Sequence, residues 1–293
     1  MATQTATTGN LEDAQAILLS TARYTAEHNM PVAGLVEHFK LAKGSKQLTV
    51  PKVGQMDAEG LVDGVDLINS QGIGLTTTDL TTAEVGLKVI LTYKLINQFN
   101  EDVFKMIGRQ MGDAEARYKD EALIALFSAL NGGTVLGADG IKLYLSNAAA
   151  IVTYATAQKF PTPVSVVHHP NALGFLSRNS QGIGTTYWSG WMEGVSEELM
   201  RNFWDIRING VNFFHDGNIA KESGVDSGIG AVFSKSALCI IEGWAPLTET
   251  EKDISLRAHE VVITSDYGVF ELDDGYGAPL QNEIGTLSTS ETS

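Results

Sequence analysis

One segment constrains the fold of this chain more than any other, because it has the pattern of a single helix of unusual length. Between Glu101 and Leu130 there is no proline, and apolar residues recur every three or four positions, as on one face of an α-helix. Asn100 is suited to cap the amino end, and the run from Asn131 to Gly133 is suited to end the helix. At about 1.5 Å per residue such a rod is roughly 45 Å long, whereas an average helix has roughly 11–12 residues.

We therefore predict one long helix over 101–130, packed through its apolar face against the rest of the chain. Charged side chains occupy the remaining faces, as expected for a helix that is covered on one side. A rod of this length is best understood as a scaffold for strands that lack a helix of their own. Its core residues are predicted to be Phe104, Ile107, Met111, Tyr118 and Leu126.

The charge balance of the chain argues against several classes of partner. Lys and Arg number 20 against 35 Asp and Glu, which gives a net charge of −15 over 293 residues. Such a charge repels phosphate backbones, so we expect no sequence-specific nucleic-acid binding. No apolar run approaches the roughly 20 residues of a membrane helix, and the amino terminus lacks the pattern of a signal peptide. We therefore expect no membrane partner and synthesis in a cytosol-like compartment.

On the amino-terminal side of the long helix, a period of two predicts two strands, over 46–53 and 84–96. The residues between these strands are rich in Gly, Asp and Thr. Connections of this length that lack a helix are usually functional. We expect the two strands to hold the connection out as an extended hairpin arm. Short helices are predicted over 10–27 and after Pro31, the second ending at Gly44.

The carboxyl-terminal half has the alternation of a compact α/β unit, followed by a long strand pair. Its predicted helices are 146–158 and 170–176. Its predicted strands are 163–168, 207–216 around a turn at Gly210, and 228–241. The segment 177–194, rich in Gly and Ser, is predicted to be a loop. Alternation resumes from Asp253 to Leu272, with a turn predicted at 266–268. Since this last pair has no helix of its own, the rod over 101–130 is expected to cover it.

No arrangement of catalytic or ligand-binding residues stands out, so we expect no cofactor and no metal. The sequence has no nucleotide-binding loop, nucleophile elbow or metal-ligand spacing. The adjacent His168 and His169 are the best candidates for acid–base or metal chemistry, but neighbouring residues on a strand point to opposite faces. The single Cys239 lies in an apolar run and is expected to be buried. An α/β hydrolytic enzyme using His168 or His169 remains one alternative.

The order of these elements resembles the major capsid proteins of tailed bacteriophages, which have the Hong Kong 97 fold of the α+β class. The resemblance spans about 10–285 and depends on order and spacing rather than on a short motif. Its most telling parts are the passage from strand to helix over 84–132, the strand followed by proline over 164–170 and the closing strands over 254–272.

The resemblance implies a division of the chain into domains. These would be an amino-terminal arm 1–45, an extended loop 46–86, a peripheral domain 87–140 and 247–285 with the spine helix 101–130, an axial domain 141–246 and a tail 286–293.

The resemblance also implies a structural function without catalysis. Copies would form the hexamers and pentamers of an icosahedral head around double-stranded DNA, in the virion capsid, after synthesis in the host bacterial cytoplasm. Only a short polar segment precedes the first predicted helix, so a separate scaffolding protein is expected, with a portal and an optional cement protein as further partners. A phage tail or decoration protein is the other alternative. The extended loop would contact a neighbouring subunit through Leu61, Val62, Val65, Leu67 and Ile68.

Overall fold

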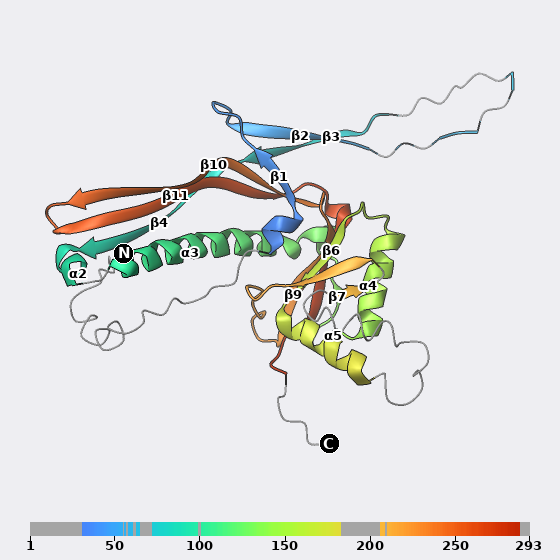
Figure 1. The fold of residues 1–293 in the computed structure, drawn as a ribbon. Helices are drawn as coiled ribbons and strands as arrows, with labels where there is room; N and C mark the ends of the chain where they lie inside the picture. Colours follow the sequence, from blue (N-terminus) through green and yellow to red (C-terminus); the bar gives the residue numbers. More distant parts are fainter. Residues whose placement is uncertain are drawn as a thin grey trace.

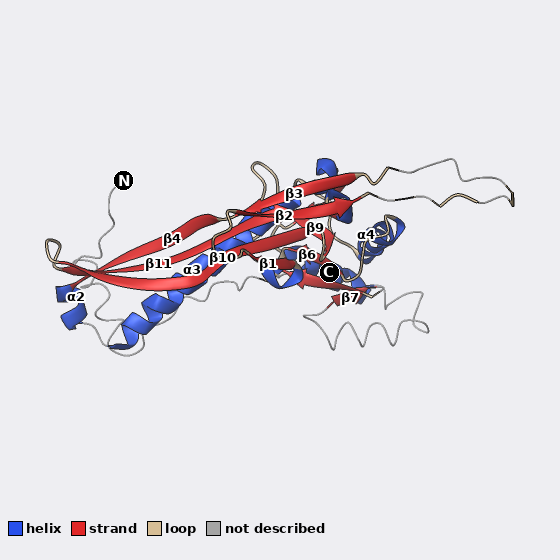
Figure 2. Cartoon of the chain, turned by 90° about the horizontal axis from the view of Figure 1, so that it is seen from above, coloured by secondary structure: helices blue, strands red, loops and turns tan. Residues whose placement is uncertain are grey.

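The subunit is elongated, with a long sheet-and-helix body joined to a compact α/β body (Figure 1). A two-stranded arm projects from the region where the two bodies meet, pointing away from the long sheet (Figures 1 and 2). The computed structural model describes residues 31–54, 56, 58–60, 63–64, 72–98, 101–182, 206–208 and 210–287. The predicted helix over 10–27 lies outside these residues.

The long helix is confirmed as α3 (Glu101–Phe127). The short helix α2 (Tyr93–Gln98) precedes it, so the strand predicted to run to residue 96 ends at Thr92 instead. The predicted stop signal forms the 3-10 turn η2 (Leu130–Gly133), in which Asn131 and Gly132 adopt φ values of 55° and 59°. Positive φ cannot continue a right-handed helix. The Asp274 carboxylate fixes this turn by accepting hydrogen bonds from the Gly132 N–H at 2.9 Å.

A four-stranded sheet in the order β1-β10-β11-β4 runs along α3 (Figure 2). Its centre is a long antiparallel hairpin whose last registered pair is Asp253 with Ala258. The short edge strand β1 is parallel to β10 and covers only Cys239–Glu242. The strands are β1 (Glu37–Lys40), β4 (Ala83–Thr92), β10 (Leu238–Asp253) and β11 (Ala258–Glu271).

The turn predicted at 266–268 is wrong, because β11 runs straight through these residues and the hairpin turns at 254–257. Gly268 pairs with Ile241 of β10 in the middle of the sheet. A Cβ atom at Gly268 would clash with the carbonyl oxygen of Thr81. The glycine is therefore required for the close approach of a neighbouring backbone and not for a turn.

The base of the arm is paired differently from the prediction. Strand β2 (Gln47–Val53) is confirmed, but its partner is β3 (Leu75–Thr81), whereas β4 pairs with β11 of the long sheet. Thr82 separates β3 from β4, and its hydroxyl donates a hydrogen bond to the Asp266 carboxylate at 2.7 Å. The chain therefore changes sheets at this residue.

The helix predicted after Pro31 is also wrong beyond its first turn. The 3-10 turn η1 (Val32–Leu35) is followed by β1, since the backbone of Glu37–Lys40 occupies an open edge of β10. Pairing with a strand distant in sequence therefore overrides the local helical spacing.

The compact body contains a six-stranded sheet in the order β5-β12-β9-β6-β8-β7. Helix α4 (Leu145–Ala157) is as predicted, but α5 (Pro170–Gly182) extends six residues beyond the predicted 176 into the predicted loop. The predicted strand 228–241 divides between two sheets, since β9 ends at Ser234 and β10 begins at Leu238. The other strands are β5 (Leu136–Gly137), β6 (Val164–His168), β7 (Ile206–Ile208), β8 (Val211–His215) and β12 (Gly277–Glu283), with the turn η4 (Asp274–Tyr276) before β12.

One hydrophobic cluster joins the two bodies at the carboxyl end of α3. Leu123, Phe127 and Leu130 are fully buried there against β9, β10 and η1. The rings of Phe127 and Phe233 lie 5.6 Å apart. A separate small cluster of Leu91 and Leu95 with partly buried neighbours lies toward the other end of the helix. The helix therefore connects two cores, which fits the predicted role of a scaffold and the α+β class.

The predicted core face of α3 is only partly correct. Met111 is buried, whereas Ile107 and Leu126 are half-buried, and the Phe104 side chain lies outside the described side chains. Tyr118 was predicted in the core but is 54 % exposed. The polar residues Glu115 and Lys119 occupy the buried face instead, in the same four-residue row as Met111 and Leu123.

Candidate functional site

The far end of the long sheet presents apolar side chains on a firmly held turn. Ile254 is 84 % exposed and Leu256 is 52 % exposed, in the turn that joins β10 to β11. The Asp253 carboxylate accepts hydrogen bonds from the Ser255 hydroxyl at 2.6 Å and from the backbone N–H groups of Ser255 and Leu256. The hydrogen bond from the Ser255 side chain is the main cause that lowers the pKa of Asp253.

The same turn is attached to α2, because the Tyr93 N–H donates to the carbonyl oxygen of Arg257 at 2.9 Å. The described part of the chain therefore leaves these two apolar side chains largely uncovered. We name residues 254–257 the sheet tip. The alternation of Ile254 and Leu256 with polar residues predicts a strand here, whereas these residues form the turn of the hairpin.

A second exposed apolar row lies on the arm. Val53 and Leu75 pair across β2 and β3, and both are more than half exposed, as are Met56 and Ile73 farther out. At the arm's base, the Lys52 ammonium lies 2.6 Å from the Asp273 carboxylate, which fixes the arm to the compact body. The five residues predicted to contact a neighbour, Leu61, Val62, Val65, Leu67 and Ile68, lie outside the described residues.

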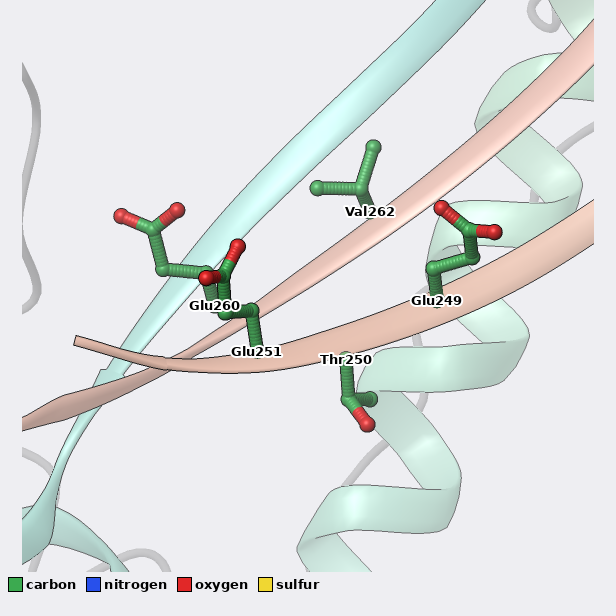
Figure 3. A pocket seen from close by; sticks show the side chains of 5 residues that line it. All are labelled: Glu249, Thr250, Glu251, Glu260 and Val262. Atoms are coloured by element: carbon green, nitrogen blue, oxygen red, sulfur yellow. The ribbon is translucent and has the colours of Figure 1, made fainter.

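An acidic pocket lies on the outer face of the β10–β11 hairpin, near the sheet tip (Figure 3). Glu251 stands directly opposite Glu260, and Glu249 opposite Val262. The Lys88 ammonium forms an ion pair with the Glu260 carboxylate at 2.5 Å. Like charges directly opposite each other destabilise a strand pair. Within the described part of the chain, no group of three or more His, Cys, Asp or Glu side chains is placed to hold a metal ion.

Both candidate histidines make local hydrogen bonds at the junction of β6 and α5. His168 is fully buried at the end of β6, and this burial lowers its pKa to about 4. Its Nδ1 accepts a hydrogen bond from the backbone N–H of His169 at 2.8 Å, and the His169 ring accepts one from the N–H of Asn171 at the start of α5. A buried neutral imidazole has no route to a substrate, so nothing here favours the hydrolytic alternative.

Cys239 is fully buried, as predicted, and burial raises the pKa of its thiol to about 12. The thiolate is the reactive form of cysteine, so this side chain is chemically inert at neutral pH.

A pair of buried acids was not anticipated from the sequence. Asp120 of α3 and Asp216, which follows β8, are both completely buried. The pKa of Asp120 is raised to about 8, chiefly because burial disfavours its charged form and secondly because of its hydrogen bond with the Asp216 carboxyl. An aspartate in the middle of a helix with charged faces gives no signal of burial. Only the fold brings these two residues together.

Among the described residues, no helix has the length and apolar character needed to cross a membrane.

Comparison with known proteins supplies the last observation. No protein-family model matches this chain, and no curated protein matches it in sequence. Solved structures do match over most of the chain. The capsid of a native GTA particle superposes with a TM-score of 0.69 at 12 % identity, covering 90 % of this chain and 93 % of that one.

Two cyanophage structures match in the same way. The capsid structure of the cyanophage P-SCSP1u has a TM-score of 0.63 at 15 % identity and covers 91 % of this chain and 92 % of its own. The capsid asymmetric unit of the cyanophage Pam1 has a TM-score of 0.65 at 11 % identity, and the match covers 92 % of this chain and 98 % of that one. In each case the match covers at least 90 % of both chains. This chain therefore has the Hong Kong 97-like fold of phage capsid proteins.

Proposed function

We propose that this chain is a major capsid protein whose copies assemble into the hexamers and pentamers of an icosahedral phage head. The observation that carries the proposal is the match of the whole subunit, over about nine-tenths of both chains, to capsid structures. The exposed apolar side chains at the sheet tip and along the arm support it independently. The β10–β11 hairpin reaches one end of the long sheet, and the arm projects away from that sheet (Figure 1).

The proposed domain division is the one that the resemblance implies, although β12 (Gly277–Glu283) lies in the sheet of the compact body. It retains the arm 1–45, the extended loop 46–86, the peripheral domain 87–140 and 247–285, the axial domain 141–246 and the tail 286–293. In this proposal the mature location is the virion capsid, after synthesis in the host cytoplasm, and the partners beyond further copies are a scaffolding protein, a portal and an optional cement protein.

The charge of the chain is consistent with a shell that does not bind its genome tightly. Between Lys52 and Lys88 the sequence contains acidic residues but no Lys or Arg. A surface of this kind repels DNA phosphates. Shell formation in this proposal therefore depends on apolar contacts between subunits and not on nucleic acid.

Negative-stain electron microscopy of the purified full-length chain, alone and with its scaffolding protein, tests the proposed function. Closed shells support a capsid protein. Tubes or small closed rings instead indicate a tail or decoration protein, and uniform small particles in both samples contradict assembly altogether.

Deleting residues 57–74 and joining the ends with a short turn is expected to abolish shells while leaving a folded, soluble subunit. The deleted segment is rich in Gly and Asp, and its apolar residues between Leu61 and Ile68 are proposed to be buried on a neighbour and not on their own subunit. Its ordering contacts are proposed to lie on a neighbour. Thermal unfolding should stay close to that of the wild type, and microscopy should find no shells.

A variant in which 57–74 is replaced by a Gly/Ser linker of equal length separates the length of the loop from its side chains, and it too should fail to form shells. Unfolding of the deletion variant would place the segment in the subunit core. Normal shells from either variant would refute its role as a clamp between subunits.

Replacing Ile254 with serine is expected to weaken assembly without affecting folding. The side chain is 84 % exposed, so the free energy of unfolding should change by less than about 0.5 kcal/mol. Each contact between subunits that buries this side chain should lose about 1.5–3 kcal/mol of association free energy. Light scattering against protein concentration should show assembly only at higher concentrations. Ile254→Val is the matched control and should assemble normally; equal behaviour of the two variants would remove the sheet tip from the interface.

A further inference from the structure

Three segments distant in sequence meet at the side chain of Asp120, on the buried face of α3. The backbone N–H of Val32, in the turn η1, donates to Asp120 Oδ1 at 3.3 Å. The Asn218 side-chain amide, in the loop after β8, donates to Asp120 Oδ2 at 2.9 Å. Asp120 has no exposed surface. This carboxyl therefore connects the helix to the segment that enters from the amino terminus and to a loop of the compact body.

Asp216 contributes a second carboxyl at the same place. Its Oδ1 accepts a hydrogen bond from the Asn218 N–H at 2.8 Å, and its own N–H donates to the His168 carbonyl oxygen at 3.0 Å. Its Oδ2 is buried and receives no hydrogen bond from any ordinary donor among the described residues. Asn218 joins the two carboxyls, since its side-chain amide donates to Asp120 and its backbone N–H donates to Asp216. A hydrogen bond with the Asp216 side chain also raises the pKa of Asp120.

The two cationic residues next to Asp120 along α3 interact with other groups. Lys119, the next residue on the helix, lies 3.3 Å from Glu115 and 4.8 Å from the centre of the Tyr267 ring. Arg117 pairs with Glu121 at 3.7 Å. Two buried carboxylates in contact cannot both stay ionised without a cation. A hydrogen atom on one of them removes the repulsion and also supplies the donor that Asp216 Oδ2 lacks.

We propose that Asp120 and Asp216 share one proton, and that this proton holds the turn η1 and the loop after β8 against the long helix. The Asp120 hydroxyl donates to Asp216 Oδ2, while Asp120 still accepts from Val32 and Asn218. The arrangement is a latch that opens when the proton is lost, because the two ionised groups then repel each other. The proposal concerns the single subunit and does not depend on assembly.

Three histidines lie on or next to the segments that meet at this pair. His168, whose carbonyl oxygen accepts from Asp216, is neutral because burial lowers its pKa to about 4. His215 directly precedes Asp216, and the Nε2–H of His38 donates a hydrogen bond to the Ala33 carbonyl oxygen at 2.7 Å. The face of β9 that packs near this part of α3 is apolar, with Ala231 and Phe233 buried. The hydrogen bond with the Asp216 side chain is the second cause, after burial, that raises the pKa of Asp120.

The sign of the pH dependence follows from the direction of the shift. The pKa of Asp120 is raised to about 8 in the folded chain, against an ordinary value of 3.8. Between these two values the folded chain holds a proton that the unfolded chain has released, so stability falls as pH rises through this range. Below about pH 4 both states hold the proton, and above about pH 8 neither does. The contribution of the latch is thus largest in acid and absent in alkali.

The experiment is urea unfolding of the full-length subunit, kept at a concentration below assembly, at intervals from pH 5 to pH 9. In the wild type the latch should make the unfolding equilibrium constant rise by up to about tenfold per pH unit as the pH increases toward 8. Asp120→Asn should remove this component, because its amide N–H donates to Asp216 Oδ2 at every pH. Asp216→Asn should remove it as well, because the introduced amide would donate to an ionised Asp120 and needs no shared proton.

The matched control is Glu121→Gln, which removes an exposed carboxylate from the same helix and should retain the wild-type slope. Carbon-13 NMR of labelled aspartate in the wild type, which requires no substitution, should show a buried carboxyl titrating near pH 8. Equal slopes in wild type and both Asp→Asn variants, or no aspartate titrating above pH 6, would overturn the proposal. So would a rise in the unfolding temperature of the wild type, absent from Asp120→Asn, on adding millimolar Ca²⁺ or Mg²⁺ at pH 7, since a metal ion would then bridge the pair.

Discussion

Replacing Ala114 with proline is expected to disrupt the subunit, because it breaks α3 near its midpoint. Proline removes one backbone hydrogen bond of the helix, and its ring clashes with the preceding turn, at a cost of about 3 kcal/mol or more. The damage should extend beyond one turn, because α3 connects the cluster around Leu91 with the cluster around Phe127. Urea unfolding and the soluble fraction after expression would measure the loss, and we expect the variant to be insoluble or unable to assemble.

Gly112→Ala is the control for this change, on the same helix and two residues away. An added Cβ at Gly112 would meet no atom within 4 Å. Alanine is a better helix former than glycine, so this variant should be more stable by roughly 0.5–1 kcal/mol. A proline variant with normal stability and normal particles would mean that the subunit does not need a continuous helix.

Phe127→Ala is expected to cause the largest loss of stability from a single truncation, about 3–5 kcal/mol. The side chain is completely buried and packs against the Phe233 ring, with 5.6 Å between centroids. The surrounding cluster contains residues of η1, α3, β6, β9 and β10, so a cavity there affects both bodies at once. Urea unfolding monitored by tryptophan fluorescence and by far-ultraviolet circular dichroism would measure the loss.

Tyr118→Ala provides the comparison, since it removes a large aromatic side chain that is 54 % exposed on the same helix. Its cost should be about 1 kcal/mol or less. A similar loss for both variants would show that the cluster around Phe127 is not the junction between the two bodies.

Elements with strong periodicity could be predicted from the sequence, whereas pairing between distant segments could not. The long helix, the strand before Pro170 and the helix after it all follow from local spacing. Strand β3 was missed because its Thr-rich sequence has only one buried apolar residue, Leu80. Gly268 was misread as part of a turn because a glycine required by a close backbone contact resembles a turn glycine in sequence.

Less of the candidate site could be predicted than of the fold. The apolar loop residues expected at an interface, Leu61 to Ile68, lie outside the described residues and remain a prediction. Ile254 was assigned to a strand because alternation in a sequence does not reveal where a hairpin turns. The contact between Asp120 and Asp216 joins residues 96 positions apart, and no spacing rule connects them.

The short strand β1 has a consequence for how crowded subunits behave before they assemble. Because β1 covers only Cys239–Glu242, the edge of β10 from Gly243 to Asp253 has no strand beside it within the described part of the chain. An unpaired edge of this length can pair with the edge of another copy, and repeated pairing of this kind leads to aggregation. Charged side chains and bulges on the edge strand oppose such pairing. This edge has both, with register shifts around Trp244 and charges at Glu249, Glu251 and Lys252. Two such edges brought together would place acidic side chains against each other, so fibre growth is disfavoured even at high copy number.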